Sequence, residues 1–379
     1  MKKKYFIFSI VTLVLFAIVI TCFNYFKNTK NYVEDNTSKP TKITKGISMN
    51  LEQTAGAGDY KTVTQSSWPT EGYVFNAELS RCENGSEISW DDTKKAVIMQ
   101  GNVSDKCYVY FDIYQPTLAE YIKSQYTGTQ GENGIYYHNS TLTNGAGDNS
   151  YRYAGASDSV NNYICLGSDA ATCPDANLFR IIGVFGDQTK VIRAKSVGNQ
   201  KWDTNGSNTW SSSSLNTYLN GEYLTSLGTL AEKIATTTWK VGGGSWANIG
   251  TSVPKTAYQY EVGSSASSTT YDAKIGLMYV SDYYYGASPS AWTLMGYNSD
   301  AMKDYRAATS TNWLYLGSYE WTISRRSDDT NSAFCVNSTG YVFLYDVASI
   351  RGVRPSFNLL SSTTYVSGSG SMSDPIIIE

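Results

Sequence analysis

Few side chains in the chain could do chemistry. His138 is the only histidine in the 379 residues, which excludes zinc sites of the His-Glu-x-x-His kind. The sequence has no Cys-x-x-Cys pair, no Gly-Lys phosphate loop and no Gly-x-Ser-x-Gly elbow. Cys335 lies in the apolar segment AFCVNS, which favours a buried structural thiol over a partner for His138. A glycosidase pair could be drawn from the 33 acidic residues, but no pair stands out, so no catalytic residue is assigned.

Ligand binding is indicated by the aromatic segment SDYYYGASPSAWTLMGY. Side chains alternate along a strand, so at least one of Tyr283–Tyr285 is expected to be exposed unless the segment is packed beneath another. Exposed aromatic faces stack on sugar rings and on protein partners, although the same rings could form a satellite core. The candidate ligand-binding residues are Tyr283, Tyr284, Tyr285, Trp292, Trp313 and Arg325.

Charged residues give two weaker indications. Four late arginines could converge on an anion, although ion pairs with neighbouring aspartates are favoured: Arg325, Arg326, Arg351 and Arg354. The string Asp328–Asn331, with Asp282, offers oxygen ligands for calcium, but it lacks EF-hand spacing and is more typical of a turn. No metal site and no cofactor are therefore expected, and calcium is the open alternative.

The six cysteines predict two disulfides. Cys82 and Cys107 flank a small β segment, and Cys165 and Cys173 flank a short polar loop. On the oxidising side of a membrane, these are the natural pairs. Loop entropy would then contribute about 3.5 and 2.5 kcal/mol respectively. The alternative is that all four are reduced and buried.

The N-terminus predicts a membrane anchor, residues 1–27. Three lysines precede an unbroken apolar run, residues 5–23, which is roughly 28 Å long as a helix. No small-x-small cleavage site follows the run, and Thr21 before Cys22 fits a lipoprotein poorly, which leaves a cleaved signal and a lipoprotein as alternatives. We therefore expect a single-pass protein of the cell membrane with its C-terminal domain extracellular, an orientation set by the short basic N-terminus.

Composition and turn signals divide the rest of the chain. Residues 28–48 are polar and lysine-rich, which predicts a flexible stalk that behaves as a random coil. Short apolar segments separated by turns predict a small antiparallel β domain over 49–115. Residues 116–162 read as a helix and a linker, with Leu118, Tyr121 and Ile122 at helical spacing. Residues 163–379 are expected to form one larger α+β domain that starts with a hairpin around Gly186-Asp187.

Motifs in the last domain carry a family resemblance. The order WDTNGSNTWSSSSLNTYLN, IGLMYVSDYYYGA, NWLYLGSYEWTISRR, AFCVNSTGYVF, GVRPSFNLL resembles uncharacterised surface-associated domains of low-GC Gram-positive bacteria (DUF6273-like). That family is distantly similar to formylglycine-generating-enzyme and C-type-lectin-like domains. The resemblance implies an α+β fold of that kind over about 163–379, but no activity. Formylglycine-generating enzymes use two late cysteines, and Cys335 is alone here, which argues against their reaction.

Composition limits the partners. The net charge is only −3 with no long run of one sign, so nucleic acid is not an expected partner. Charged residues are 17% of the chain and aromatic residues 14%, a balance found on recognition surfaces and also in secreted β-rich proteins. The predicted function is extracellular binding or adhesion by a membrane-anchored protein, with a glycan or protein ligand. The alternatives are a carbohydrate-active enzyme that uses carboxylates and a structural envelope component.

Overall fold

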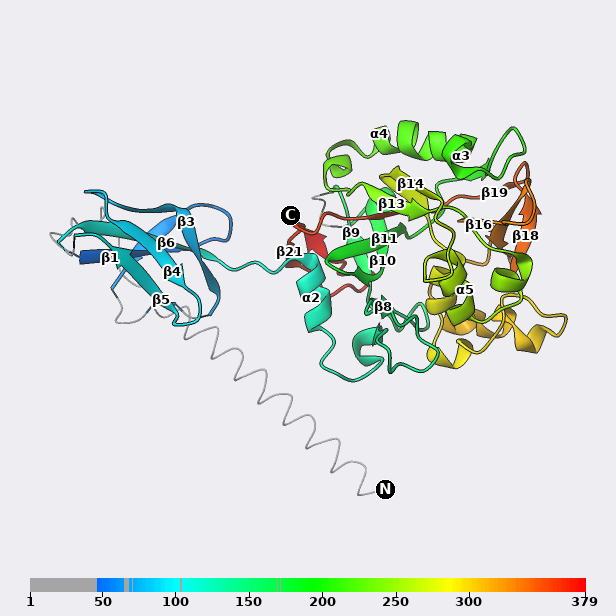
Figure 1. Ribbon diagram of the computed structural model, residues 1–379, viewed down its shortest axis with the longest axis horizontal. Coiled ribbons are helices and arrows are strands. Elements are labelled where there is room, and N and C mark those ends of the chain that lie inside the picture. Colours follow the sequence, from blue (N-terminus) through cyan, green and yellow to red (C-terminus); the bar gives the residue numbers. More distant parts are fainter. Residues whose placement is uncertain (1–45, 65–67, 70, 103, 169, 171) are drawn as a thin grey trace, which may run out of the picture. The chain divides into compact units, whose positions relative to one another are not determined.

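The protein consists of two compact units and is mostly β. The computed structural model describes residues 46–379 except 65–67, 70, 103, 169 and 171. One unit ends at Tyr114 and the other comprises Gln115–Glu379 (Figure 1). Strands hold 36% of residues and helices 20%. The expected α+β class is therefore wrong.

The expected membrane span finds no support. No helix among the described residues is long and apolar enough to cross a membrane. Residues 5–23 lie outside the described residues, as do the anchor and most of the stalk. The expectation of a single-pass membrane protein is corrected accordingly. The last stalk residues, 46–48, belong to a strand.

The first unit is a four-stranded sheet with an added hairpin. Its strand order is β2-β1-β6-β3, and β4 pairs with β5. The strands are β1 (Gly46–Glu52), β2 (Tyr60–Val63), β3 (Tyr73–Cys82), β4 (Glu87–Asp91), β5 (Ala96–Gln100) and β6 (Lys106–Ile113). The β1–β6 pair is parallel, so the all-antiparallel expectation is wrong for it. The first and last strands can pair this way because the intervening chain supplies the crossover. Met49, Val109 and Phe111 form the core.

The second unit is built on a larger central sheet. Its order is β15-β20-β11-β10-β8-β7, with β9 also pairing with β10. The strands are β7 (Ile135–Tyr137), β8 (Tyr151–Tyr153), β9 (Tyr163–Cys165), β10 (Leu178–Phe185), β11 (Gln188–Arg193), β15 (Ile275–Leu277) and β20 (Pro355–Asn358). The β10–β11 hairpin turns at Gly186-Asp187, as the sequence predicts. In Figure 1, α2 (Leu118–Ser124) lies beside this sheet and contacts β10 and β11.

Smaller sheets complete this unit. A five-stranded sheet has the order β12-β19-β16-β17-β18, and two hairpins pair β13 with β14 and β21 with β22. The strands are β12 (Asn199–Lys201), β13 (Thr237–Lys240), β14 (Thr270–Ala273), β16 (Glu320–Arg325), β17 (Ser332–Val336), β18 (Val342–Asp346), β19 (Ile350–Gly352), β21 (Tyr365–Ser367) and β22 (Ile377–Ile378).

The helices are short, which explains the low helix content. The α-helices after α2 are α3 (Ser214–Tyr218), α4 (Leu224–Ser226), α5 (Pro254–Glu261) and α6 (Val280–Tyr285). The 3₁₀- and π-helical turns are Glu132–Gly134, Asp175–Asn177, Trp210–Ser212, Leu219–Tyr223, Gly228–Glu232, Trp246–Gly250, Pro289–Ala291, Ala301–Lys303 and Tyr305–Thr311. The segment TLAEKIATTTW forms a 3₁₀ turn and then β13. Its run of β-branched threonines favours a strand.

The core of the second unit is rich in tryptophan, and three of the buried indoles donate to backbone carbonyls. Trp202, Trp239 and Trp313 are at most 1% exposed. Their Nε1 atoms donate to backbone carbonyls of Thr322, Ala273 and Tyr153 at 3.0, 3.1 and 2.8 Å. Such bonds let a large ring be buried without leaving its N–H unpaired.

Both expected disulfides are present, so reducing them should destabilise each unit. Cys82–Cys107 joins facing positions of β3 and β6, and Cys165–Cys173 closes a loop with a separation of 8 residues. Cleaving the shorter loop should lower the free energy of unfolding of the second unit by about 2.5 kcal/mol, because the unfolded chain regains loop entropy. Denaturant unfolding of the oxidised protein and of the double variant Cys165→Ser, Cys173→Ser measures this. Equal midpoints would contradict the prediction, and Cys335→Ala is the control because that thiol is free and buried.

Candidate functional site

A group of buried charges lies on one face of the central sheet. Arg152 comes from β8, Lys190 from β11 and Asp282 from α6. Their side chains are only 2%, 7% and 3% exposed. Asp282 pairs with both cations. Its Oδ2 lies 2.5 Å from Lys190 Nζ, and its Oδ1 lies 3.8 Å from Arg152 Nη1. Asp282 therefore contacts both buried cations, and Asp148 is a second carboxylate partner of Arg152, as burial of charge requires.

Strand register explains why the two cations meet. Arg152 pairs with Gly183 on β10, Gly183 pairs with Lys190 on β11, and Lys190 pairs with Asn358 on β20. Paired residues on neighbouring strands point to the same face, so these four positions form one row. A Cβ at Gly183 would come within 2.3 Å of the Tyr151 carbonyl oxygen. Glycine thus permits the close approach of β8 that places Arg152 near Lys190.

Two carboxylates hold the start of α6. Asp282 accepts the backbone N–H of Tyr279 at 2.8 Å. Glu261, the last residue of α5, accepts the N–H groups of Val280 and Ser281 at 2.9 and 2.7 Å. Negative side chains stabilise a helix N-terminus because they satisfy its free N–H groups and oppose its dipole. Burial raises the pKa of Glu261 to about 7, against the hydrogen bonds that lower it.

Aromatic rings surround both cations. The Arg152 guanidinium carbon lies 4.7, 5.3 and 5.1 Å from the ring centroids of Phe185, Tyr258 and Tyr285. Lys190 Nζ lies 4.6, 5.4 and 5.8 Å from those of Tyr279, Trp239 and Phe185. Rings at these distances attract a cation through their negative faces, and the attraction grows when water is excluded.

A cavity of about 240 Å³ opens onto this group, and we call it the charged cavity. It is lined by Asp148, Arg152, Phe185, Lys190, Thr237, Thr238, Trp239, Lys240, Tyr258, Val262, Tyr279, Ser281, Asp282 and Asn358. Its lining combines four aromatic residues, Phe185, Trp239, Tyr258 and Tyr279, with the buried ionic group. This is the usual make-up of a small-molecule site, in which apolar walls bury the ligand and a few polar groups orient it.

Asp148 and Arg152 keep their charges at neutral pH. Asp148 Oδ2 lies 2.6 Å from Arg152 Nη2. Burial alone would raise the pKa of Asp148, but Arg152 and the hydrogen bonds of Ser150 lower it to about 2. Burial likewise works to lower the pKa of Arg152, yet Asp148 and Asp282 raise it. Asp148 is therefore a carboxylate that binds and orients; it has no proton to give as a general acid.

Burial lowers the pKa of Lys190 despite its contact with Asp282. Among the described residues, the Lys190 ammonium donates one hydrogen bond, to Asp282. An ammonium has three donors. The remaining donor capacity of Lys190 is therefore available to a ligand in the charged cavity.

The expected exposed aromatic loop is wrong. Tyr283–Tyr285 form the second half of α6 and are at most 1% exposed. Their hydroxyls donate to the backbone carbonyls of Gly340, Ile249 and Asn144 at 2.7, 2.9 and 3.1 Å. A helix sends successive side chains in different directions, and here each ring finds its own buried carbonyl. The alternation argument assumed a strand, and it does not apply.

The two candidate tryptophans are also core residues. Trp292 and Trp313 are 0% and 1% exposed. Their Nε1 atoms donate to the carbonyls of Ala287 and Tyr153 at 2.9 and 2.8 Å. Neither ring offers a face to a ligand at the surface.

Arg325 donates hydrogen bonds to two loops and does not line the charged cavity. Its Nε donates to the Gly242 carbonyl at 3.1 Å and its Nη1 to Asn208 Oδ1 at 3.1 Å. Both partners come from loops that cross the end of β16. The arginine therefore ties those loops to the strand.

The candidate calcium ligands lie apart from one another and are bound to cations. Asp282 pairs with Lys190, whereas Asp328 and Asp329 pair with Arg326 at 2.7 and 3.3 Å. Among the described residues, no group of three or more histidine, cysteine or acidic side chains is placed to hold a metal ion.

Sequence reasoning missed the three residues that matter most here. Arg152, Asp148 and Lys190 lie in segments read as linker or as hairpin. A weak signal was available: Lys190 directly precedes the apolar pair Val191-Ile192, and Arg152 stands between two tyrosines. A cation inside a short apolar strand must be paired when the strand is buried.

Part of this unit matches a family model. Residues 186–361 match the family described as Domain of unknown function (DUF6273). The matched stretch contains Lys190, Trp239 and Asp282, whereas Asp148 and Arg152 precede it. The resemblance to an uncharacterised domain family is thus supported for this stretch. No curated protein and no solved structure matches the chain.

His138 is buried beside this group. Its Nδ1 accepts the Ala146 N–H at 3.1 Å, and its ring lies 4.7 Å from that of Tyr285. Within the described residues its Nε2 has no hydrogen-bond partner. Burial, and then the charge of Arg152, lower the pKa of His138 well below its ordinary value, while Asp148 acts in the opposite direction.

Removing the buried lysine should cost far more than removing an exposed one. Lys190→Met leaves the Asp282 carboxylate with its more distant cation partner, so the free energy of unfolding should fall by roughly 3–5 kcal/mol. The matched control is Lys195→Met. Lys195 lies 2.6 Å from Asp175, but both side chains are more than half exposed, and the expected loss is under about 1 kcal/mol. Urea unfolding of the three proteins measures both values, and equal losses would refute the ion-pair account.

Acid should destabilise the second unit through His138. The folded protein keeps this imidazole neutral, whereas the unfolded chain binds a proton below about pH 6.5. The contribution of His138 to the free energy of unfolding should therefore fall by about 1 kcal/mol between pH 7.5 and 5.5. Glu261, with its raised pKa, contributes with the opposite sign, so the comparison is with His138→Gln, which should lack the His138 part of the slope. The same slope in both proteins would show that His138 does not titrate on unfolding.

Proposed function

We propose that the second unit is an extracellular carbohydrate-recognition unit that binds one acidic sugar residue in the charged cavity. The observation that supports this is the buried ionic group beside the four aromatic residues of the lining. Arg152 and Lys190 are buried, bridged by Asp282, and open onto a cavity of about 240 Å³.

Charge favours an anionic ligand. Three cations line the charged cavity, Arg152, Lys190 and Lys240, against two carboxylates, Asp148 and Asp282. One positive charge is therefore left in a water-poor site, where electrostatic attraction is stronger than in bulk water. A ligand carboxylate that accepts from the lysine or arginine would form charge-assisted hydrogen bonds.

Size and lining favour a single sugar ring. The cavity volume lies below the roughly 300–1,000 Å³ of sites for drug-sized ligands, so one residue rather than an extended chain fits. The partly buried rings of Phe185 and Tyr258 offer apolar faces of the kind on which sugars stack. Thr237 and Asn358 supply neutral hydrogen-bonding groups at the rim, suited to hydroxyls.

Extracellular exposure is supported by the two disulfides, which persist in oxidising compartments. The proposal also includes a distant resemblance of this domain family to C-type-lectin-like and formylglycine-generating-enzyme domains. It further includes that the domain belongs among the surface-associated domains of low-GC Gram-positive bacteria. A recognition role on a cell surface agrees with a small, water-poor binding site.

The alternatives receive less support. A carboxylate-pair glycosidase needs a carboxylic acid that can donate a proton. The low pKa of Asp148 and the two-cation contact of Asp282 disfavour that role for both. A purely structural role would leave the buried cations and their cavity without a purpose beyond packing.

Titration calorimetry with monosaccharides tests the proposal. The probes are glucuronic acid, galacturonic acid and N-acetylneuraminic acid, each against a neutral sugar of similar size. At least one acidic sugar should bind, and its neutral counterpart should bind at least about tenfold more weakly, because one charge-assisted hydrogen bond contributes roughly 1.5 kcal/mol or more. Absence of binding by every acidic sugar to the folded protein would end the proposal.

An isosteric variant locates the binding. Asn358→Asp puts a negative charge in the same row as Lys190 and should weaken acidic-sugar binding about tenfold through repulsion. Asn199→Asp is the matched control, since Asn199 is exposed on β12 and does not line the charged cavity. Equal weakening by both variants would mean that net charge, and not this cavity, governs the binding.

A further inference from the structure

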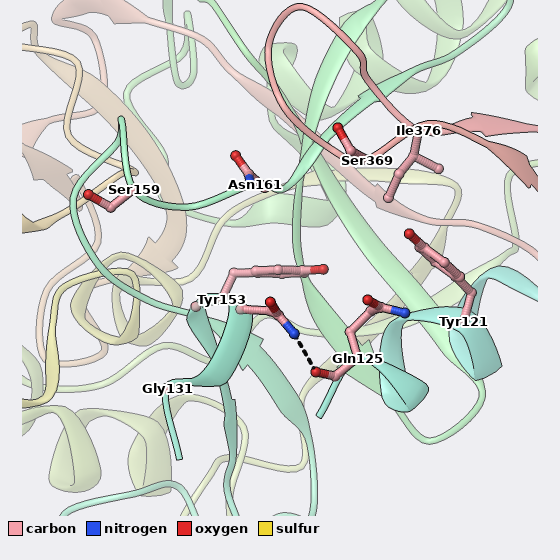
Figure 2. Close-up of a pocket in the computed structure, with 10 residues that line it drawn as sticks. Tyr121, Gln125, Gly131, Tyr153, Ser159, Asn161, Ser369 and Ile376 are labelled. Atoms are coloured by element: carbon pink, nitrogen blue, oxygen red, sulfur yellow. Dashed lines mark hydrogen bonds between the residues drawn. The ribbon is translucent and has the colours of Figure 1, made fainter. Parts of the chain in front are cut away.

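A second cavity lies elsewhere in the same unit, and we call it the neutral cavity. It has a volume of about 350 Å³. Five segments form it: the end of α2 with Gln125, residues 131–134, Tyr153 of β8, residues 159–161 and the C-terminal segment 369–376 (Figure 2). None of its ten lining residues is charged. Its chemistry therefore differs from that of the charged cavity, whose lining includes the buried ionic group.

A buried phenol points into the neutral cavity. Tyr153 is only 4% exposed, and no hydrogen bond from its hydroxyl is recorded among the described residues. Figure 2 shows its ring extending from β8 into the space between Gln125, Tyr121 and Asn161. Burial raises the pKa of Tyr153, so the hydroxyl stays protonated and able to donate at neutral pH. At the wall of the neutral cavity this hydroxyl can donate to a ligand or to water.

Amide side chains supply both donors and acceptors around this hydroxyl. Asn133 Nδ2 donates to the Gln125 carbonyl at 2.8 Å, which fixes the amide and leaves its Oδ1 to accept (Figure 2). Asn161 lines the opposite side of the neutral cavity and is exposed. An amide donates and accepts at once, and a sugar hydroxyl does the same.

An aromatic wall completes the neutral cavity. The ring of Tyr121 stacks on that of Tyr365 with centroids 3.6 Å apart and an interplanar angle of 7°. Both hydroxyls point to the Gly368 carbonyl, at 3.5 and 3.1 Å. The ring that lines the cavity is thus held rigidly, and a rigid aromatic face costs little conformational entropy when it meets a ligand.

We propose that the neutral cavity is a binding site for an uncharged sugar residue. The absence of charge among its lining residues disfavours acids, amines and phosphates, which would lose their hydration without an ionic partner. Its paired donors and acceptors and one aromatic face fit a ring that carries several hydroxyls. The site is separate from the charged cavity, and its occupancy does not depend on that cavity binding an acidic sugar.

Ligand-observed NMR and calorimetry with glucose, galactose, mannose and N-acetylglucosamine test this proposal. At least one of them should bind the full chain. Tyr153→Phe removes only the hydroxyl and should weaken that binding about fivefold, as expected for the loss of one neutral hydrogen bond. Asn161→Ala, on an exposed segment, gives a second variant whose folding is not at risk, and it should also weaken binding.

The control is Asn358→Asp in the charged cavity, which should leave neutral-sugar binding unchanged while it weakens binding of acidic sugars.

Four outcomes would overturn the proposal. They are absence of binding by all four sugars, unchanged affinity in both Tyr153→Phe and Asn161→Ala, loss of neutral-sugar binding in Asn358→Asp, and tighter binding of a neutral tripeptide such as Ala-Gln-Ala. If Tyr153→Phe still binds acidic sugars, a failure of the neutral-cavity proposal is distinguished from a failure of the proposed function.

Discussion

The Asp282 carboxylate connects the central sheet to the helix that crosses it. It accepts the Lys190 ammonium at 2.5 Å and the Tyr279 N–H at 2.8 Å, and it lies 3.8 Å from the Arg152 guanidinium. Buried charges tolerate little displacement, because a lost partner leaves an uncompensated ion in a medium of low dielectric constant. The position of α6, the row of strand residues below it and the shape of the charged cavity all follow from keeping these three contacts together.

Once α6 is fixed at its start, the tyrosines that follow have little freedom. The turn of the helix sends Tyr283, Tyr284 and Tyr285 to three different parts of the core, where each hydroxyl bonds a backbone carbonyl. Glu261 adds the second anchor through Val280. An aromatic run that suggested a binding surface thus stabilises the scaffold of the site, and the ligand-facing rings come from other elements.

Local signals in the sequence predicted local structure well. The Gly186-Asp187 turn predicted the β10–β11 hairpin, and the helical spacing of Leu118, Tyr121 and Ile122 predicted α2. The charged cavity could not be found in this way, because Arg152 and Lys190 meet only through a strand that lies between them in the sheet. Register between distant segments is set by the packing of the whole unit, and no single stretch of residues encodes it. The same reason accounts for the parallel β1–β6 pair.

Two cavities of unlike charge in one unit follow from the two faces of one strand, β8. Arg152 and Tyr153 are neighbours on β8, and adjacent strand residues point to opposite faces. One face therefore receives the guanidinium and must gather carboxylates around it. The other face receives a phenol, needs no counter-charge, and can be closed by amides and tyrosines. A shift of β8 by one residue would exchange the two side chains between faces and destroy both cavities together. The close approach at Gly183 opposes such a shift, since the paired strand tolerates no added Cβ there.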